Sequence, residues 1–316
     1  MIATPPPSRS WRYDAGLALV VLIWGLNFAV IKVALEEAPP FTVNALRFIV
    51  SILVIGGLYF RQRQDEIGGF FGPLKRAPWR IVGLGMLGYV GYQVCFIIGV
   101  NLTSAGSAAL IVASAPLWTA LLAQVVGVDH LPRAAWVALA VSLVGVGVVT
   151  LSGGPTVDGE SRTVLGDLLM LGSAAMWAAY TVASRPVFAA GGSPTGVTFW
   201  GVAAALPILL GLGLYELPQV DYSGLSPTFW LAIIFSGGLS TGLAYAIWNV
   251  VVKAIGPSQT AASTNVVPFV AVLAGVVILG ESISTGQIVG GVLIIGSIIL
   301  MRRVRGRVEP RAAARG

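Results

Sequence analysis

Residues 22–32 read Leu22-Ile23-Trp24-Gly25-Leu26-Asn27-Phe28-Ala29-Val30-Ile31-Lys32 and lie inside an apolar segment that runs from residue 13 to residue 34. About 20 helical residues, rising about 1.5 Å each, match the roughly 30 Å hydrocarbon core of a bilayer. This segment is therefore expected to cross a membrane as one helix.

The same pattern returns in the second half of the chain. Trp24 matches Trp177 at an offset of 153 positions, and Pro116 matches Pro268 at an offset of 152. Further pairs at these offsets are Asp14 with Asp167, Lys32 with Arg185, and Asp129 with Glu281. The matches indicate that the chain contains two copies of one unit.

The composition is that of a membrane protein. Of the 316 residues, 56% are hydrophobic and 10% are charged, whereas about a quarter of the residues of a soluble domain are charged. The single cysteine, Cys95, excludes an internal disulfide and a thiolate metal cluster. Neither a cofactor nor a metal is expected, and residues 1–12 lack the pattern of a cleaved signal peptide.

Ten apolar segments follow one another, five before a polar break and five after it. They cover residues 13–34, 41–60, 80–101, 105–126, 133–151, 164–187, 195–214, 227–253, 258–279 and 284–302. Each is expected to be a helix, because backbone polar groups in lipid must be paired within the segment. The predicted fold is an all-α polytopic membrane protein with ten transmembrane helices. Since five is odd, the second copy enters the membrane upside down, which gives two inverted five-helix repeats, a plan typical of secondary transporters.

The predicted organisation has five parts. They are a cytoplasmic N-terminal segment at 1–12, a first repeat at 13–151, an extracytoplasmic linker at 152–163, a second repeat at 164–302 and a basic cytoplasmic tail at 303–316.

Charge predicts the orientation. With the N-terminus inside, 16 of the 19 Lys and Arg residues fall on the inner side and most acids fall on the outer side. Cytoplasmic loops favour basic residues, so we expect a bacterial inner-membrane protein with both termini cytoplasmic. The net charge of +6 then serves contact with membrane lipid, and no nucleic-acid partner is expected.

Aromatic and amide side chains gather near the middle of several predicted helices. Trp24 and Asn27 are three residues apart and share a helix face, and Trp177 and Tyr180 repeat this spacing. A buried tyrosine hydroxyl or tryptophan N–H needs a partner, which a wet cavity supplies. We therefore predict a central substrate cavity; interhelical packing is the alternative for any single residue. The predicted substrate-binding residues are Trp24, Asn27, Tyr89, Tyr92, Gln93, Ser114, Trp177, Tyr180, Tyr245, Trp248, Asn249 and Asn265.

Two aligned prolines, Pro116 and Pro268, are predicted to kink their helices. Proline lacks an N–H, so the carbonyl four residues earlier loses its helical partner. Neighbouring hydroxyls then satisfy the freed carbonyl in a packing kink, or the carbonyl faces a cavity.

Few charged residues fall inside the predicted spans. Lys32 and Arg47 are the cations there, and they either extend toward the outer surface or attract an anionic group of the cargo. The acids can all be assigned to loops or span ends, with Asp14 and Asp167 at helix starts and Glu281 in a turn. Proton coupling through an embedded carboxylate is therefore not expected, unless Glu281 folds back toward the site.

Motifs of soluble enzymes are not supported. The glycines at 83, 85 and 88 fit a dinucleotide fingerprint, but they lie within an apolar span that no strand precedes. The only histidine, His130, lies in a predicted loop, and no metal-protease, Walker or Ser/His/Asp pattern is present. An enzyme is therefore not expected.

The chain resembles the EamA-type exporters of the drug/metabolite transporter superfamily over residues 14–302. The similarity lies in Trp24-Gly25 with Asn27-Phe28, in the two prolines, and in Leu279-Gly280-Glu281 followed by Gln287 and Gly290-Gly291. Val128-Asp129 and Trp177-Ala178 depart from the family pattern, which usually has Gly-Glu and Trp-Gly there. The resemblance implies a ten-helix exporter of small metabolites, among them amino acids, and the central aromatic residues are similar to those of aromatic amino acid exporters.

Three functions remain open at this point. The first is export of amino acids, aromatic or other neutral ones, by alternating access, by a monomer or weak homo-oligomer. The second is a sugar-phosphate or nucleotide-sugar carrier, which should need several intramembrane cations to bind phosphate. The third is a multidrug exporter of organic cations, which aromatic faces can bind.

Overall fold

The structure is a computed structural model that describes residues 11–62, 66, 68–127, 132–152, 160–189, 193–255 and 264–313. Within these ranges every regular element is a helix. The first copy comprises α1 (Trp11–Leu35), α2 (Pro40–Gln62), α3 (Gly72–Arg76), α4 (Pro78–Gly85), η2 (Met86–Gly91), α5 (Tyr92–Leu102), α6 (Ala105–Val112), α7 (Ala115–Val125) and α8 (Arg133–Leu151). The second comprises α9 (Glu160–Ala189), α10 (Pro194–Glu216), η3 (Leu217–Gln219), α11 (Pro227–Ile234), η4 (Phe235–Leu243), α12 (Ala244–Ile255), η5 (Thr264–Val266), α14 (Val267–Leu279) and α15 (Thr285–Ala313).

An apolar helix lies in each of the ten predicted spans, and residues 258–263 of the ninth span lie outside the described residues. Seven are long and apolar enough to cross a membrane: 11–35, 40–62, 78–102, 105–125, 163–188, 194–219 and 227–248. Three shorter apolar helices cover 135–151, 267–279 and 285–301. The all-α polytopic fold is confirmed. The helix α15 continues to Ala313, so the backbone of most of the predicted tail is helical.

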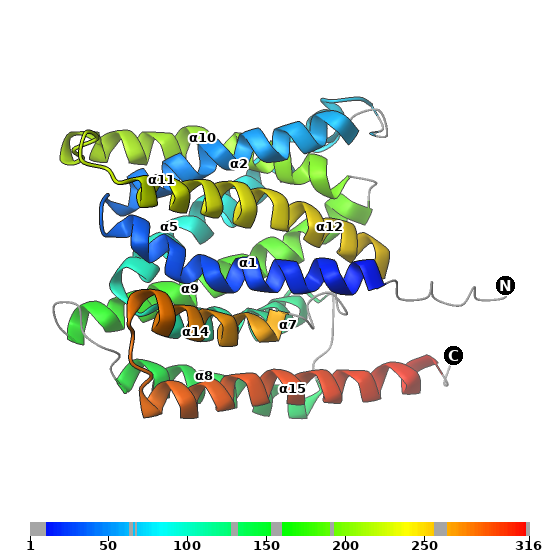
Figure 1. The fold of residues 1–316 in the computed structure, drawn as a ribbon. Helices are drawn as coiled ribbons and strands as arrows, with labels where there is room; N and C mark the ends of the chain where they lie inside the picture. Colours follow the sequence, from blue (N-terminus) through cyan, green and yellow to red (C-terminus); the bar gives the residue numbers. More distant parts are fainter. Residues whose placement is uncertain are drawn as a thin grey trace.

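The second copy is inverted with respect to the first. In Figure 1, α1 runs from the right-hand end of the molecule to the left, whereas α9 runs from left to right. The second helices, α2 and α10, are reversed in the same way. Consequently α1 begins and α15 ends at the same end of the molecule (Figure 1).

The two copies interlock. Helix α1 of the first copy packs on α14 and α12 of the second, and the equivalent first helix of the second copy, α9, packs on α6, α7 and α5 of the first. The remaining helices also pair across the copies, α2 with α10 and α8 with α15. The predicted repeats therefore share one interior, and any site at the centre receives side chains from both.

Small residues allow these close approaches. A Cβ at Gly25 would collide with the Val270 side chain across the α1–α14 contact. A Cβ at Gly213 would lie 2.6 Å from the Cβ of Ala45 between α10 and α2. Helices in lipid gain association energy from such close backbone packing, because lipid tails provide no hydrophobic drive between helices.

Two spans contain a π-helical segment at equivalent places. The third span has η2 and the eighth has η4, and both are joined to α-helices before and after. The sequence predicted helical spans here, and the π-helical segments within them were not predicted. π-Helical turns are rare and concentrate at functional sites.

Candidate functional site

Seven predicted aromatic residues form one connected cluster at the interface of the two copies. We call Trp24, Tyr89, Tyr92, Trp177, Tyr180, Tyr245 and Trp248 the aromatic cluster. The ring of Trp24 lies 5.6 Å from that of Tyr245 and 5.1 Å from that of Trp248, measured between centroids. The indole N–H of Trp24 donates to the carbonyl of Ser240, 3.1 Å away, in η4. The first helix is thereby fixed against the eighth span.

Trp177 is the centre of the cluster. Its ring centroid lies 5.4 Å from Tyr92, 5.4 Å from Tyr180 and 5.8 Å from Tyr245. Tyr180 continues the chain of contacts to Tyr89, whose hydroxyl is 3.3 Å from its own. The structure thus brings together side chains from α1, η2, α5, α9 and α12. Such separations are those of favourable offset or edge-to-face aromatic pairs.

The π-helical segments adjoin the tyrosines of the cluster. Tyr92 is the first residue of α5, directly after η2, and Tyr245 is the second residue of α12, directly after η4. Glycine makes room beside them: a Cβ at Gly88 would lie 2.5 Å from the Tyr180 ring. A π-helical segment therefore lies next to a tyrosine of the cluster in each copy, and in the first copy it also carries the closely packed Gly88.

Two predicted amides are buried beside the aromatic rings. Asn27 is 5% exposed and Gln93 is 3% exposed, yet Asn27 Oδ1 and Gln93 Oε1 have no hydrogen-bond partner within the described ranges. Asn27 lies about one turn from Trp24 on α1, and Gln93 follows Tyr92 on α5. Buried polar atoms are nearly always paired, so each of these oxygens has a hydrogen bond to offer to a water or a ligand.

Arg47 is a functional candidate that the predicted site set did not contain. It is 2% exposed, so it does not extend toward the surface, and that alternative is wrong for this residue. Its Nη1 donates to Asn44 Oδ1 at 3.3 Å, while its Nε and the Nδ2 of Asn44 lack partners in the described structure. The guanidinium is close enough to Tyr92 and Tyr245 for its charge to act on both hydroxyls.

The remaining predicted site residues have other surroundings. The hydroxyl of Ser114 donates to the carbonyl of Ile111 at 2.6 Å, in the break between α6 and α7. Pro116 lies in the first turn of α7 and Pro268 in the first turn of α14, so each proline stands where one helical piece begins. The side chains of Asn249 and Asn265 lie outside the described residues.

A second buried polar group lies at the left-hand end of Figure 1, around the turn between α5 and α6. Lys32 Nζ donates to the carbonyls of Thr103 at 2.5 Å and Val100 at 3.3 Å. The hydroxyl of Thr103 donates to Asp167 Oδ1 at 2.6 Å. Asp167 is 2% exposed and lies seven residues inside α9, so its expected position at a helix start is wrong.

Glu281 and Gln287 complete this group. Glu281 accepts hydrogen bonds from the backbone N–H groups of Ala105, at 2.8 Å, and Gly106, at 3.3 Å, at the start of α6. Gln287 Nε2 donates to the hydroxyls of Ser104 and Ser107. Glu281 therefore folds back onto the first copy, at the start of α6 and not at the aromatic cluster. We call Lys32, Thr103, Asp167, Glu281 and Gln287 the end clasp.

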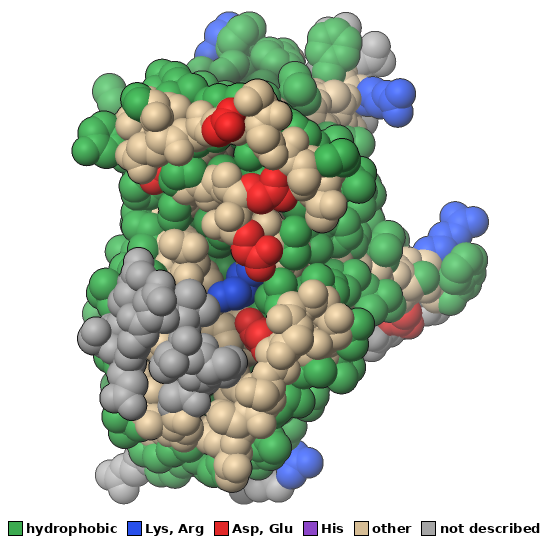
Figure 2. Space-filling view, turned by 60° about the vertical axis from the view of Figure 1, so that its left-hand side comes forward, with side chains coloured by type: hydrophobic (Ala, Val, Ile, Leu, Met, Phe, Trp, Pro, Cys, Tyr) green, Lys and Arg blue, Asp and Glu red, His purple; other side chains and the backbone are tan. Residues whose placement is uncertain are grey.

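This end of the molecule carries a row of acidic side chains with a basic one among them, as Figure 2 shows. One acid, Glu37, accepts hydrogen bonds from the backbone N–H of Ser226, at 2.7 Å, and from its hydroxyl, at 2.6 Å. These two bonds lower the pKa of Glu37, since they stabilise its charged form. The contact joins the end of α1 to the start of α11.

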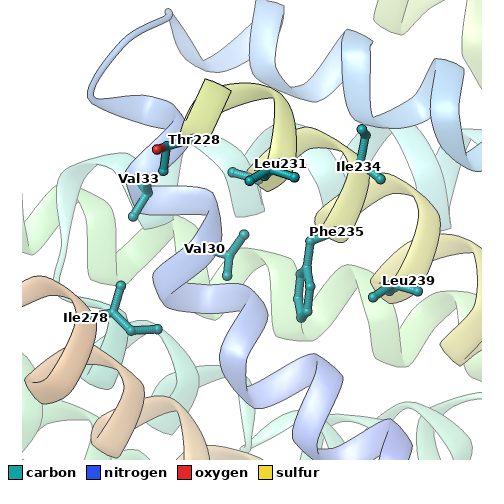
Figure 3. A pocket seen from close by; sticks show the side chains of 9 residues that line it. Val30, Val33, Thr228, Leu231, Ile234, Phe235, Leu239 and Ile278 are labelled. Carbon is teal, nitrogen blue, oxygen red and sulfur yellow. The ribbon is translucent and has the colours of Figure 1, made fainter. Parts of the chain in front are cut away.

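An apolar groove of about 450 Å³ lies between α1 and α11. Figure 3 shows its lining side chains, which come from α1, α11, η4 and α14. They include Val30, Val33, Leu231, Phe235 and Ile278, with Thr228 as the polar member. The groove shares no residue with the aromatic cluster, and its chemistry suits hydrocarbon chains.

Metal chemistry has no support in the geometry. No group of three or more His, Cys, Asp and Glu residues that could hold a metal ion occurs in the ranges that the structure describes.

Comparison with known proteins defines the class. The sequence profile of the EamA-like transporter family matches the chain twice, over residues 11–151 and 164–303. The chain therefore belongs to the EamA-like transporter family, and it is a multi-pass membrane transporter.

Individual relatives are distant but cover most of the chain. The "Uncharacterized transporter YyaM" of Bacillus subtilis is 29% identical over 72% of this chain and 73% of its own length. The "Probable amino-acid metabolite efflux pump" of Salmonella typhimurium is 27% identical over 92% of this chain and 94% of its own length. A solved crystal structure has the same fold, with a TM-score of 0.64, 21% identity, and coverage of 95% of this chain and all of the other.

Proposed function

We propose that this transporter exports amino acids from the bacterial cytoplasm by alternating access. The observation that carries the proposal is the aromatic cluster, which takes residues from both inverted copies and lies beside buried polar atoms without partners. A site at the interface of inverted repeats is reached from either side when the repeats exchange conformations. The name of the relative from Salmonella typhimurium supports amino acids as cargo.

The competing cargoes fit less well. A sugar phosphate carries at least two negative charges, and Lys32 is engaged with backbone carbonyls in the end clasp. Of the two cations predicted inside the spans, Arg47 is then the one left for phosphate recognition, which generally uses several cations. An organic cation would enter a site that already holds the buried charge of Arg47, and like charges repel strongly where the dielectric constant is low.

The function can be tested in cells that overproduce the protein. Cells are loaded with dipeptides or nucleosides, and the efflux of each amino acid or nucleoside is measured against cells that produce Trp177→Ala at equal membrane abundance. We expect faster efflux of one or more amino acids, lost in the variant. Equal efflux of all amino acids from both strains would contradict the proposal.

We also propose that the acidic end faces outward and that both termini are cytoplasmic, because the basic residues Arg12, Arg61 and Arg303 lie at the opposite ends of their helices. Single cysteines at positions 158 and 310, in a protein with Cys95→Ala, test this orientation. An impermeant thiol reagent applied to whole cells should label position 158 and spare position 310. The reverse pattern would require the opposite orientation.

A further inference from the structure

Arg47 carries a buried charge with little compensation in the part of the chain that the structure describes. The residue lies seven positions after the start of α2, about 10 Å along the helix axis. A charged side chain at membrane depth is costly and ordinarily pairs with an opposite charge. Within the described ranges its side-chain hydrogen bond is to neutral Asn44, and no carboxylate contacts it.

The backbone around Arg47 is closely packed, which fixes its position. A Cβ at Gly237, in η4, would collide with the carbonyl oxygen of Arg47. The π-helical segment therefore lies directly against this turn of α2. Helix α2 packs on η4 and on α5, the segments that carry or directly precede Tyr245 and Tyr92, so Arg47 approaches the aromatic cluster from the side of α2.

The buried polar atoms without partners differ in type from place to place. On α2 they are Arg47 Nε, Asn44 Nδ2 and the hydroxyls of Thr42 and Ser51, and each of these groups can donate a hydrogen bond. On α1 and α5, the helices that carry Trp24 and Tyr92, they are acceptors, namely Asn27 Oδ1 and Gln93 Oε1. Donors around a fixed positive charge suit a carboxylate, which accepts two parallel hydrogen bonds from arginine. Carbonyl oxygens and aromatic faces suit an ammonium group.

We propose that Arg47 and Asn44 bind the carboxylate group of the cargo, so that the transporter selects molecules with one carboxylate. This inference rests on the proposed function and narrows it, since it assigns the charged group by which an amino acid is held. The cargo anion supplies the counter-charge that the protein itself does not place beside Arg47. The ammonium group and the side chain of the cargo then lie toward the aromatic cluster.

The first test compares ligands that differ in the carboxylate alone. Purified protein in nanodiscs is titrated with each neutral L-amino acid, with the matching amino acid amide and with the matching monocarboxylate that lacks the amino group. We expect the amide of the tightest amino acid to bind at least about 10-fold more weakly, because hydrogen bonds to a charged group are lost. Equal binding of acid and amide, or no binding by any carboxylate, would overturn the proposal.

The second test places a carboxylate in the protein. Asn44→Asp puts an anion against Arg47 in nearly the same shape, and it should raise the Tm while weakening amino-acid binding at least about 10-fold. A misfolded variant would lower the Tm instead. Asn101→Asp is the matched control, because it adds the same charge nine residues, or about 13 Å, along the helix from Tyr92. Binding that is unchanged in Asn44→Asp would overturn the assignment.

Arg47→Gln separates this inference from the proposed function. If cells export an amino acid equally with the wild type and with Arg47→Gln, the function stands and the role of Arg47 falls. If a monocarboxylate binds in an Arg47-dependent manner but no amino acid is exported, the carboxylate site stands and amino acids are not the cargo.

Discussion

The aromatic cluster and the end clasp each combine buried and half-buried residues, are partly polar, and are built from the two copies of the repeat. They differ in how their polar groups are satisfied. In the end clasp, Asp167, Glu281 and Gln287 each have a hydrogen-bond partner on another element. Beside the aromatic cluster, Asn27, Gln93 and Arg47 keep polar atoms without one. A satisfied network stabilises structure, whereas polar atoms without partners still have hydrogen bonds to form.

Lys32 and Arg47, the two cations predicted inside the spans, differ in the same way in how their hydrogen-bond donors are satisfied. Lys32 donates to carbonyls at the C-terminal end of α5, where the helix dipole favours a positive charge. Arg47 has no such arrangement around it. We therefore assign Lys32 to structure and Arg47 to cargo binding.

The largest expected effect is in the aromatic cluster. Trp177→Ala removes three ring contacts at the centre and should destabilise the fold by about 3–5 kcal/mol, with loss of transport. The measurements are Tm and efflux at equal membrane abundance. Trp79→Ala removes the same side chain at a position that is 85% exposed and should change both little. If the two variants behaved alike, the cluster would have no special role.

A smaller effect is expected in the end clasp. Asp167→Asn weakens its charged hydrogen bond to Thr103 and should cost about 1–3 kcal/mol of stability. Cargo affinity should remain within about twofold, because Asp167 lies ten residues, or about 15 Å, along α9 from Trp177. Calorimetry and ligand titration of the same preparation measure the two quantities. A large loss of affinity with little loss of stability would move the binding site toward this end.

A still smaller effect is expected at the exposed contact between Glu37 and Ser226. The pKa of Glu37 is lowered in the folded protein, so its stabilising contribution is present above the unfolded pKa of about 4.3 and is lost as pH falls through the folded value. Ser226→Ala should therefore flatten the dependence of Tm on pH between pH 5 and pH 3. Ser223→Ala removes the equivalent hydroxyl from Asp221, whose pKa is likewise lowered, and should flatten the dependence in the same way. An unchanged pH dependence in both variants would contradict the assignment.

The smallest effect concerns energy coupling. The aromatic cluster and Arg47 contain no carboxylate that could take up and release a proton, so transport should follow the gradient of the cargo. In proteoliposomes with equal cargo on both sides, an imposed pH difference should give no net accumulation. Accumulation that disappears in Asp167→Asn would instead assign proton coupling to the end clasp.

Much of the fold could be predicted because its signals are local and repeated. The apolar segments, the pair Trp24 and Trp177, and the pair Pro116 and Pro268 lie directly in the sequence. They gave ten spans in two inverted copies. Seven of the predicted aromatic residues do lie together, and they were chosen because mid-span tryptophan and tyrosine are unusual at that depth.

The features that the sequence did not predict depend on neighbours that are distant in the sequence. Whether a turn is α-helical or π-helical in η2 and η4 depends on packing such as that of Gly237 against Arg47. The depth of a residue in its span does not reveal what surrounds it, so Lys32 and Arg47 looked equivalent. A usable signal existed for Arg47, since Asn44 precedes it by three residues and shares its helix face.

The π-helical segments also determine the direction in which the side chains that follow them point. Removing one residue from a helix rotates everything beyond it by about 100° around the axis. Tyr92 and Tyr245 stand directly beyond η2 and η4, so the hydrogen-bond register of each segment determines where the next ring points. A deletion of Gly91 would turn Tyr92 away from Trp177. The two segments belong to inverted copies. A change of hydrogen-bond register in one copy alone would therefore turn one tyrosine away from the central site and leave its counterpart in place. The site would then be asymmetric with respect to the two sides of the membrane.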